Sequence, residues 1–415
     1  MLATGLKCFI VALHVPEMRC RRAFPAGVPH NGWMTLDLRI VAIATTGFCA
    51  FVNLYSVQAL LPALAKDFGV GAGEVSWLMT AGTAAIALTA PFTGVVADVI
   101  GRKRLIAAAM FAIVVPTLLM TLVQSVPAFA FWRFVQGLLL PPIFTVAVAY
   151  IGDEWPAADV PRVAGIYISG SSLGGFSGRF IPGVLTDLVG WRLAFAVVAL
   201  LTLAAAIIVA LTLPRERRFV RSGGLTASLA QMLHHLREPQ LLATYAIGFG
   251  VLFNFIATFT YVSFHLAAPP YGFSPTLLGA LFFTYLVSSP IVPWVGRAIV
   301  LFGRRPFVLG VIALWMVGVL LLLAPPVAAI MAGLTLCAVC GMICQAVSTG
   351  YVATTAKEGR SSAVGLYATS YYVGGSAGAL LTGLAWTYAG WNGCVAVILA
   401  MQVIIAGLVA VMWGK

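Results

Sequence analysis

Two arginines inside long apolar segments are the residues of this sequence best suited to bind a charged molecule. Arg133 and Arg179 each lie between runs of apolar residues, and the acidic residue nearest to Arg179 along the chain is Asp187. A charged side chain in an apolar environment is costly unless it has a partner or faces a water-filled cavity. Two cations against one carboxylate leave excess positive charge, which a bound anion would offset. The pattern therefore predicts a site for a carboxylate, a phosphate or a similar acidic group, held by bidentate arginine contacts.

An internal network is the alternative explanation for both arginines. Arg133 would then donate hydrogen bonds to helix carbonyl groups and to Gln136, which follows three residues later. Arg179 would pair with Asp187 or extend its charged end toward the membrane surface. The sequence leaves both explanations open.

Other polar side chains within the apolar segments are candidates for contact with a solute or a coupling ion: Asn53, Gln58, Gln136, Asn254, Tyr371 and Tyr372. All Asp and Glu residues fall in loops or at helix ends, so no buried carboxylate is marked as a proton carrier. No nucleophile–base pair, phosphate-binding loop or zinc-ligand spacing occurs, so an enzyme is not expected. Cys337, Cys340 and Cys344 share one helical face, but such cysteines are usually small packing residues, and we expect neither a metal nor a cofactor.

The composition indicates which elements carry these side chains. Apolar residues make up 61% of the 415 residues and charged residues only 9%, which is too little charge for the surface of a water-soluble protein. The chain is therefore predicted to be an all-α membrane protein with many spans. Apolar runs long enough to cross a bilayer predict twelve helices, at about 38–61, 75–97, 105–123, 129–151, 163–188, 193–213, 241–266, 276–298, 306–323, 327–355, 361–388 and 393–413.

The charged residues predict the orientation of these helices. With both ends of the chain in the cytoplasm, only four of the 24 Lys and Arg residues fall within spans or on the outer side, namely Lys66, Arg133, Arg179 and Arg192. Cations accumulate on the cytoplasmic side of membrane proteins. The net charge of +12 therefore reflects topology, and the expected partner is the lipid bilayer and not a nucleic acid.

A short basic loop occurs twice. In the first copy, Gly94, Asp98, Gly101, Arg102 and Lys103 place a carboxylate, a tight turn and cations at the end of the second predicted helix. The second copy keeps the spacing with Gly296, Gly303 and Arg304, but Val300 replaces Asp98. A motif repeated after about 200 residues indicates a duplicated membrane protein.

The segments 163–188 and 361–388 repeat each other at an offset of 200 residues. They share the glycines Gly174, Gly175 and Gly178, which recur as Gly374, Gly375 and Gly378. Glycine lets membrane helices approach closely and slide past one another, so these residues are predicted to pack helices together. The charged residues are not repeated, because Ala379 matches Arg179 and Thr387 matches Asp187.

The basic loop resembles the loop between helices 2 and 3 of the major facilitator superfamily. The stretches Tyr167–Gly170, Gly174–Arg179 and Trp191-Arg192, together with Tyr371–Gly374, further resemble the bacterial YnfM-type efflux transporters. One departure is that many drug–proton antiporters have Gly-Pro where this chain has Gly178-Arg179. The resemblance covers the chain from about Met34 onward.

This resemblance implies a fold of twelve transmembrane helices in two pseudo-symmetric six-helix bundles with alternating access. It also implies a monomer of the inner membrane that exports a small organic solute or drug in exchange for protons. In that setting Asp98 is expected to hold one bundle against the other when the cytoplasmic face is closed. Alternatives that remain open are uptake or uniport of a small organic anion, and a membrane sensor that transports nothing.

The expected organisation has four parts. Residues 1–33 form an amino-terminal tail outside the fold, and we expect the functional protein to begin near Met34. The first bundle covers 34–213, and the second covers 240–415. Between them, residues 214–239 form a basic, flexible cytoplasmic linker.

Overall fold

A computed structural model describes residues 38–156, 158–216, 232–288, 290–291, 294–356 and 360–413 of the chain. All regular secondary structure in these ranges is helical. The predicted tail, 1–33, and most of the predicted linker lie outside the described residues, so both remain predictions.

Helices of the first half follow the predicted spans closely. They are α2 (Leu38–Tyr55), η1 (Gln58–Leu60), α3 (Leu61–Phe68), α4 (Ala72–Val75), α5 (Trp77–Thr89), η2 (Ala90–Phe92), α6 (Thr93–Ile100), α7 (Arg102–Ala112), α8 (Val114–Leu119), η3 (Met120–Leu122), α9 (Val126–Glu154), α10 (Val160–Val189) and α11 (Trp191–Thr212). One boundary was wrong. The first span was expected to end at Leu61 with Lys66 in a loop, whereas α3 continues it to Phe68.

The second half contains α13 (Pro239–Ala267), α14 (Pro275–Ala280), α15 (Phe283–Ser288), α16 (Val295–Phe302), α17 (Arg304–Leu321), α18 (Val327–Thr355) and α19 (Arg360–Met412). The eighth predicted span is therefore broken into α14, α15 and α16. The eleventh and twelfth spans form the single element α19, whose backbone turns at Gly390.

Nine stretches of the described residues are long and apolar enough to cross a membrane. One of them, Ser362–Met412, has 51 residues and contains two spans that meet at Gly390. Two further spans are α10, which is long enough but rich in glycine and serine, and the broken series α14–α16. Together these elements account for the twelve-helix fold in two bundles.

The backbone repeats the duplication seen in the sequence. Gly101 and Gly303 both have positive φ angles, of 94° and 78°, and each joins two helices in a basic loop. Gly190 and Gly390 are a second pair, with φ of 86° and 58°. Side chains other than glycine rarely adopt this conformation, so each turn requires glycine at the matched position.

The shared glycines bring the same pairs of helices together in both halves. A Cβ atom on Gly174 would meet the carbonyl oxygen of Phe48 in α2, and one on Gly374 would meet that of Phe249 in α13. Gly178 and Gly378 make the corresponding approaches to Val52 and Phe253. The first and seventh spans thus pack backbone to backbone against the fifth and eleventh. Gly375 does not take part in this backbone packing, because a Cβ atom there would meet the side chain of Leu252.

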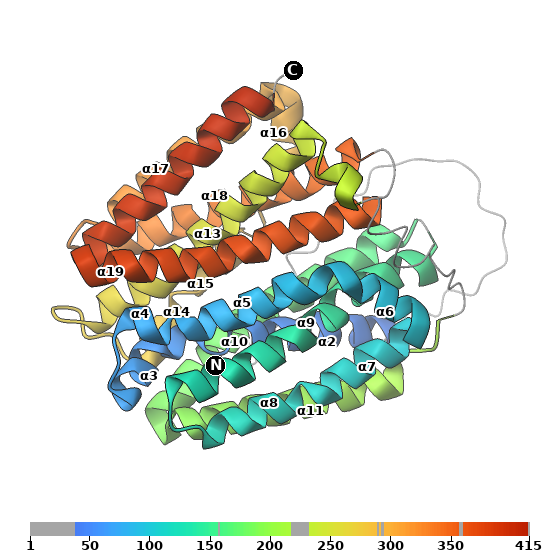
Figure 1. The fold of residues 1–415 in the computed structure, drawn as a ribbon, viewed down its shortest axis with the longest axis horizontal. Helices are drawn as coiled ribbons and strands as arrows, with labels where there is room; N and C mark the ends of the chain where they lie inside the picture. Colours follow the sequence, from blue (N-terminus) through green and yellow to red (C-terminus); the bar gives the residue numbers. More distant parts are fainter. Residues whose placement is uncertain are drawn as a thin grey trace, which may run out of the picture. The chain divides into compact units, whose positions relative to one another are not determined.

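The two bundles touch mainly along two helix pairs, α5 with α19 and α10 with α14 (Figure 1). A Cβ on Gly73 would lie 3.2 Å from the carbonyl oxygen of Gly383, and one on Gly279 would lie 2.8 Å from that of Arg179. Gly183 approaches Pro275 in the same way. Among the described residues, the close glycine contacts between the halves lie at the end of the bundles opposite the two basic loops.

Candidate substrate site between the two bundles

Arg179 lies between two aromatic rings that come from different halves of the protein. Its Cζ atom is 3.6 Å from the ring centre of Tyr55 in α2 and 4.2 Å from that of Phe282. A third ring, Tyr285 in α15, is 5.1 Å away. Arg179 is only 3% exposed. Arginine stacks well on aromatic faces, so the rings hold the plane of the guanidinium while its edge remains available for hydrogen bonds.

Two hydrogen bonds orient this guanidinium. Its Nε donates to Oε1 of Gln58 at 2.8 Å, and Nη1 donates to the carbonyl oxygen of Gly175, one turn earlier in α10, also at 2.8 Å. Gln58 in turn donates from Nε2 to Oγ1 of Thr260 in α13, at 3.3 Å. Arg179 forms no ion pair with a carboxylate of the described residues. We refer to Arg179, Gln58, Tyr55, Phe282 and Tyr285 as the Arg179 cage.

Breaks in two membrane helices place the cage. Tyr55 is the last residue of α2 and Gln58 the first of η1, so the first span loses regular α-helix between them. Phe282 lies between α14 and α15, where the eighth span is interrupted. Discontinuous membrane helices near the middle of the bilayer commonly form the binding sites of transporters.

Arg133 lies elsewhere, packed inside the first bundle. Its Nη1 donates to the carbonyl oxygen of Asn53 at 3.0 Å, and Nη2 donates to that of Leu54 at 2.8 Å. Its Nε donates to the carbonyl oxygen of Leu78 at 3.2 Å, and Oε1 of Gln136 accepts a further bond. Arg133 therefore forms the internal network that the sequence offered as the alternative to an anion site.

The side chains of Asn53 and Gln136 belong to this network as well. Oδ1 of Asn53 accepts from Nε2 of Gln136 and from Oγ1 of Thr117, both at 3.1 Å. Nδ2 of Asn53 donates to Oγ1 of Thr202 at 2.9 Å. The network ties α2, α8, α9 and α11 together, so three of the candidate polar residues hold the bundle and do not reach the Arg179 cage.

Asp187 does not pair with Arg179. Instead, its Oδ2 accepts a hydrogen bond from the backbone N–H of Thr276, in the first turn of α14, at 2.8 Å. A carboxylate is well placed at this position, because the first N–H groups of a helix have no partner within the helix. This bond joins the two halves at the end opposite the basic loops.

The remaining candidates lie in the second bundle. Asn254 is fully buried and donates from Nδ2 to the carbonyl oxygen of Gly250 at 2.7 Å. The ring centre of Tyr372 is 5.9 Å from that of Phe144 in the first bundle, and Tyr371 packs edge-on against Tyr372. The tyrosine pair thus adds a further aromatic contact between the halves.

The first basic loop contacts its own bundle and the start of the predicted linker. Arg102 forms an ion pair with Asp153 at the end of α9, and the backbone N–H of Lys103 donates to Oε2 of Glu216 at 3.3 Å. Asp98 is partly buried in α6, one turn before this loop. In the second copy, Arg304 stacks on Tyr351, with 4.5 Å from its Cζ to the ring centre.

Sequence reasoning missed the aromatic members of the cage from the eighth span, Phe282 and Tyr285. The chain contains 25 Phe and 12 Tyr residues, and nothing in their local sequence separates these two from the rest. The break in the eighth span near Phe282 was also not predicted.

These features define a multi-pass membrane protein of two repeated helix bundles, with a buried site where the bundles meet. The sequence matches the Major Facilitator Superfamily over residues 43–288, which is more than half of the chain. The protein belongs to this family: it is a membrane transporter and not an enzyme.

Two related proteins match this chain over nearly the whole length of both sequences, and both are named as transporters. The chain is 32% identical to the inner membrane transport protein YnfM of Escherichia coli (strain K12) over 370 residues, covering 89% of this chain and 88% of that protein. It is 27% identical to the uncharacterized MFS-type transporter YybF of Bacillus subtilis (strain 168), with 88% and 90% covered.

Solved structures with the same fold include a mutant of the nucleoside transporter NupG, at a TM-score of 0.76 and 13% identity, covering 90% of this chain and 100% of that one. The human organic anion transporter MFSD10 superposes with a TM-score of 0.68 at 17% identity, covering 90% and 99%. At these identities the likeness concerns the fold alone.

Proposed function

We propose that this transporter exports a small organic solute by alternating access and that the solute contacts the Arg179 cage. The observation that carries this proposal is that Arg179 has partners from both bundles, with Tyr55 and Gln58 in the first and Phe282 in the second. When two bundles rock about a central site, contacts of this kind change between the two states. The contacts of a solute bound at the cage therefore differ between the two states.

The proposed solute carries an acidic group, such as a carboxylate or a phosphate. Two of the five N–H groups of the Arg179 guanidinium donate in the bonds to Gln58 and Gly175. Its charge has no carboxylate partner among the described residues, and burial makes such a charge costly. An anion at the guanidinium edge offsets that cost through charge-assisted hydrogen bonds. Arg133 takes no part, because helix carbonyls and Gln136 use its donors.

The proposed orientation places both ends of the chain and the basic loops in the cytoplasm, following the distribution of cations. The end at which Gly73 approaches Gly383 and Asp187 bonds Thr276 is then the outer end. In this orientation the contacts close the outer side, and we propose that the structure represents an inward-facing state. Export in exchange for protons is proposed from the resemblance to YnfM-type efflux transporters, and we propose that the transporter works as a monomer of the inner membrane.

Asp98 is proposed to act at the cytoplasmic edge. The ion pair of Arg102 with Asp153 attaches the loop to the first bundle, and the backbone of Lys103 bonds Glu216 at the start of the predicted linker. A loop fixed in this way moves with its bundle, so Asp98 approaches the second bundle only when the cytoplasmic side closes. Such a contact would stabilise the outward-facing state.

Transport into proteoliposomes with an imposed pH gradient tests this function. Benzoate, phenyl phosphate and the cation tetraphenylphosphonium are suitable first substrates, because they share apolar bulk and differ in charge. We expect the parent protein to move the anions, and Arg179→Ala and Arg179→Lys to move them at least tenfold more slowly. Arg192→Ala is the matched control, because Arg192 pairs with Asp67 near the membrane surface.

Each alternative function predicts a different result. Anion movement that does not respond to the pH gradient would indicate uniport. Uptake would be indicated if the pH gradient drove the anion in the direction opposite to the one expected for export. A non-transporting sensor would bind a solute, but the three probes would cross its proteoliposomes no faster than they cross liposomes without protein. If both Arg179 variants transport the anions as fast as the parent, the cage is not the anion site.

A further inference from the structure

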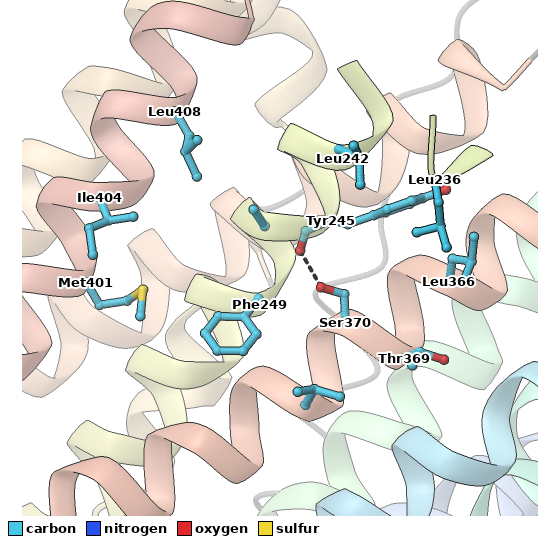
Figure 2. Close-up of a pocket in the computed structure, with 12 residues that line it drawn as sticks. Leu236, Leu242, Tyr245, Phe249, Leu366, Thr369, Ser370, Met401, Ile404 and Leu408 are labelled. Carbon is cyan, nitrogen blue, oxygen red and sulfur yellow. Dashed lines mark hydrogen bonds between the residues drawn. The ribbon is translucent and has the colours of Figure 1, made fainter. Parts of the chain in front are cut away.

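A separate apolar cavity opens within the second bundle, between α13 and both arms of α19 (Figure 2). It encloses about 520 Å³ and is lined by Leu242, Tyr245, Phe249, Ser370, Met401 and Ile404, among others. This volume is within the range of about 300–1,000 Å³ that is typical of small-molecule sites. Its lining contains no charged side chain, which distinguishes it from the Arg179 cage.

Two matched positions beside this cavity differ between the halves of the protein. In the first bundle, a Cβ on Gly170 would meet the backbone of Ala44, so α10 and α2 touch there. Ser370 and Tyr245 occupy the matching positions, 200 and 201 residues later. The Ser370 hydroxyl lies against α13 and donates to the carbonyl oxygen of Tyr245 at 2.8 Å. A side chain in place of the glycine hydrogen keeps the two helices apart and leaves room beside them.

The hydroxyl of Tyr245 is a polar group without a partner at this cavity. Tyr245 is 4% exposed, and its buried oxygen forms no hydrogen bond with any described residue. Figure 2 shows its ring extending from α13 toward Leu236, along the wall of the cavity. A buried hydroxyl without a partner is costly. If the ring turns toward the cavity, a bound molecule that brings a hydrogen-bond acceptor would be stabilised by this hydroxyl.

The mouth of the cavity opens toward the bilayer. Ile404 is 55% exposed on the surface of a membrane-spanning helix, and Leu242 is also exposed. Tyr245 follows Pro239, the first residue of α13, by six residues, or about 9 Å at helical rise. This depth is close to the boundary between the hydrocarbon core and the headgroups of a bilayer. Arg237 is exposed and directly follows Leu236, which lines the cavity.

We infer that the cavity binds one phospholipid from the leaflet on the side of the basic loops. An acyl chain fills the space between α13 and α19, where the walls are hydrocarbon. An ester carbonyl oxygen of the lipid accepts the hydrogen bond of the Tyr245 hydroxyl, and the phosphate lies near Arg237. The lipid is not the transported solute, because the cavity lies within one bundle and the Arg179 cage lies between two.

Photochemical labelling tests the position of the acyl chain. The parent and its variants are placed in nanodiscs that contain a phosphatidylglycerol with a diazirine on one acyl chain, illuminated, and digested for mass spectrometry. We expect cross-links to concentrate on peptides that contain Ala246 or Met401. Ala246→Phe fills the cavity and Ser370→Gly restores the close packing of the first bundle, so each should reduce this labelling at least fivefold. Thr45→Phe is the matched control, because Thr45 occupies the position of Ala246 in the first bundle.

Native mass spectrometry tests the ester contact. Tyr245→Phe removes one hydroxyl and keeps the ring, so it should raise the Kd of the bound phosphatidylglycerol about two- to tenfold. An unchanged Kd would exclude the hydrogen bond to the ester. Labelling that is equal in the parent, Ala246→Phe and Ser370→Gly, or spread evenly over the membrane-facing helices, would overturn the site. Equal competition by hexadecane would show that the cavity takes a free apolar solute and not a phospholipid.

Discussion

The side chain of Asp187 in α10 accepts a hydrogen bond from the backbone N–H of Thr276 in α14, with 2.8 Å between Oδ2 and N. This bond links the first bundle to the second at the end opposite the basic loops. The duplicated position in the second half is Thr387, so the carboxylate exists on one side only. The bond can form only while the two halves are closed at this end, because its partners belong to different bundles.

Removing this carboxylate should favour the opposite conformation. Losing a side-chain bond to a helix N-terminus costs about 1 kcal/mol, which corresponds to about a fivefold shift between two states. We therefore expect Asp187→Ala to increase the fraction of molecules open at this end. Distances between spin labels at Lys66 and Ala268, which are both exposed at this end, would measure the change. Asp159→Ala is the control, since Asp159 lies at the other end of α10 and is exposed. Identical distance distributions in parent and variant would show that the bond does not contribute to closure.

The two buried arginines should respond in opposite ways to substitution. Arg133→Leu removes the donor of four buried hydrogen bonds, and each lost bond costs about 1 kcal/mol. We expect this variant to lose several degrees in Tm and much of its yield in the membrane. Leu334 occupies the position of Arg133 in the second half, so leucine fits a bundle of this shape.

Arg179→Ala is the matched comparison, because Ala379 stands at the duplicated position. It should keep the yield and Tm of the parent within a few degrees while it loses transport of the anion. Thermal unfolding followed by tryptophan fluorescence and a transport assay on the same preparations would separate the two effects. If Arg133→Leu is as stable as the parent, the structural role assigned to Arg133 is wrong.

Asp98 should affect conformational balance more than folding. Asp98→Asn keeps the shape of the side chain and removes its charge, so we expect normal amounts of protein in the membrane and at least a tenfold loss of transport. Glu74→Asn, at the opposite end of the same span, serves as the control. A transport rate equal to that of the parent would leave Asp98 as a structural helix-end residue.

The orientation of the chain can be tested with reporter fusions. Fusions after Gly69 and after Pro270 should report the outer side, because both positions follow spans that begin at the basic end. A fusion within the predicted linker, 214–239, should report the cytoplasm. A linker located outside would invert the whole topology and also the proposed inward-facing state.

The sequence by itself determined the membrane class, the number of spans and the duplication. Apolar runs longer than a bilayer is thick leave no other fold open, since every backbone N–H and C=O must be paired within the membrane. The matched glycines showed which individual residues correspond between the two halves, and the structure shows Gly174 and Gly374 at equivalent backbone contacts. These properties depend on local composition and spacing, which can be read without knowing how the helices pack.

Only the tertiary structure separated the roles of the two arginines. Arg133 and Arg179 look alike in sequence, because each is one cation within an apolar helix. Their difference comes from neighbours far away in the chain: Asn53 and Leu78 surround the first, while Tyr55 and Phe282 stack on the second. Helical periodicity predicts which face a residue occupies but not which helix covers that face.

The same reason applies to the breaks that form the cage and to the cavity beside Tyr245. Pro62 follows the interruption of the first span, but the sequence alone does not show that the regular helix ends at Tyr55. Ser370 and Gly170 differ by one hydroxymethyl group, and a space between helices results only because α13 lies directly against Ser370. These effects depend on packing between segments more than 100 residues apart, and that packing cannot be read from the sequence alone.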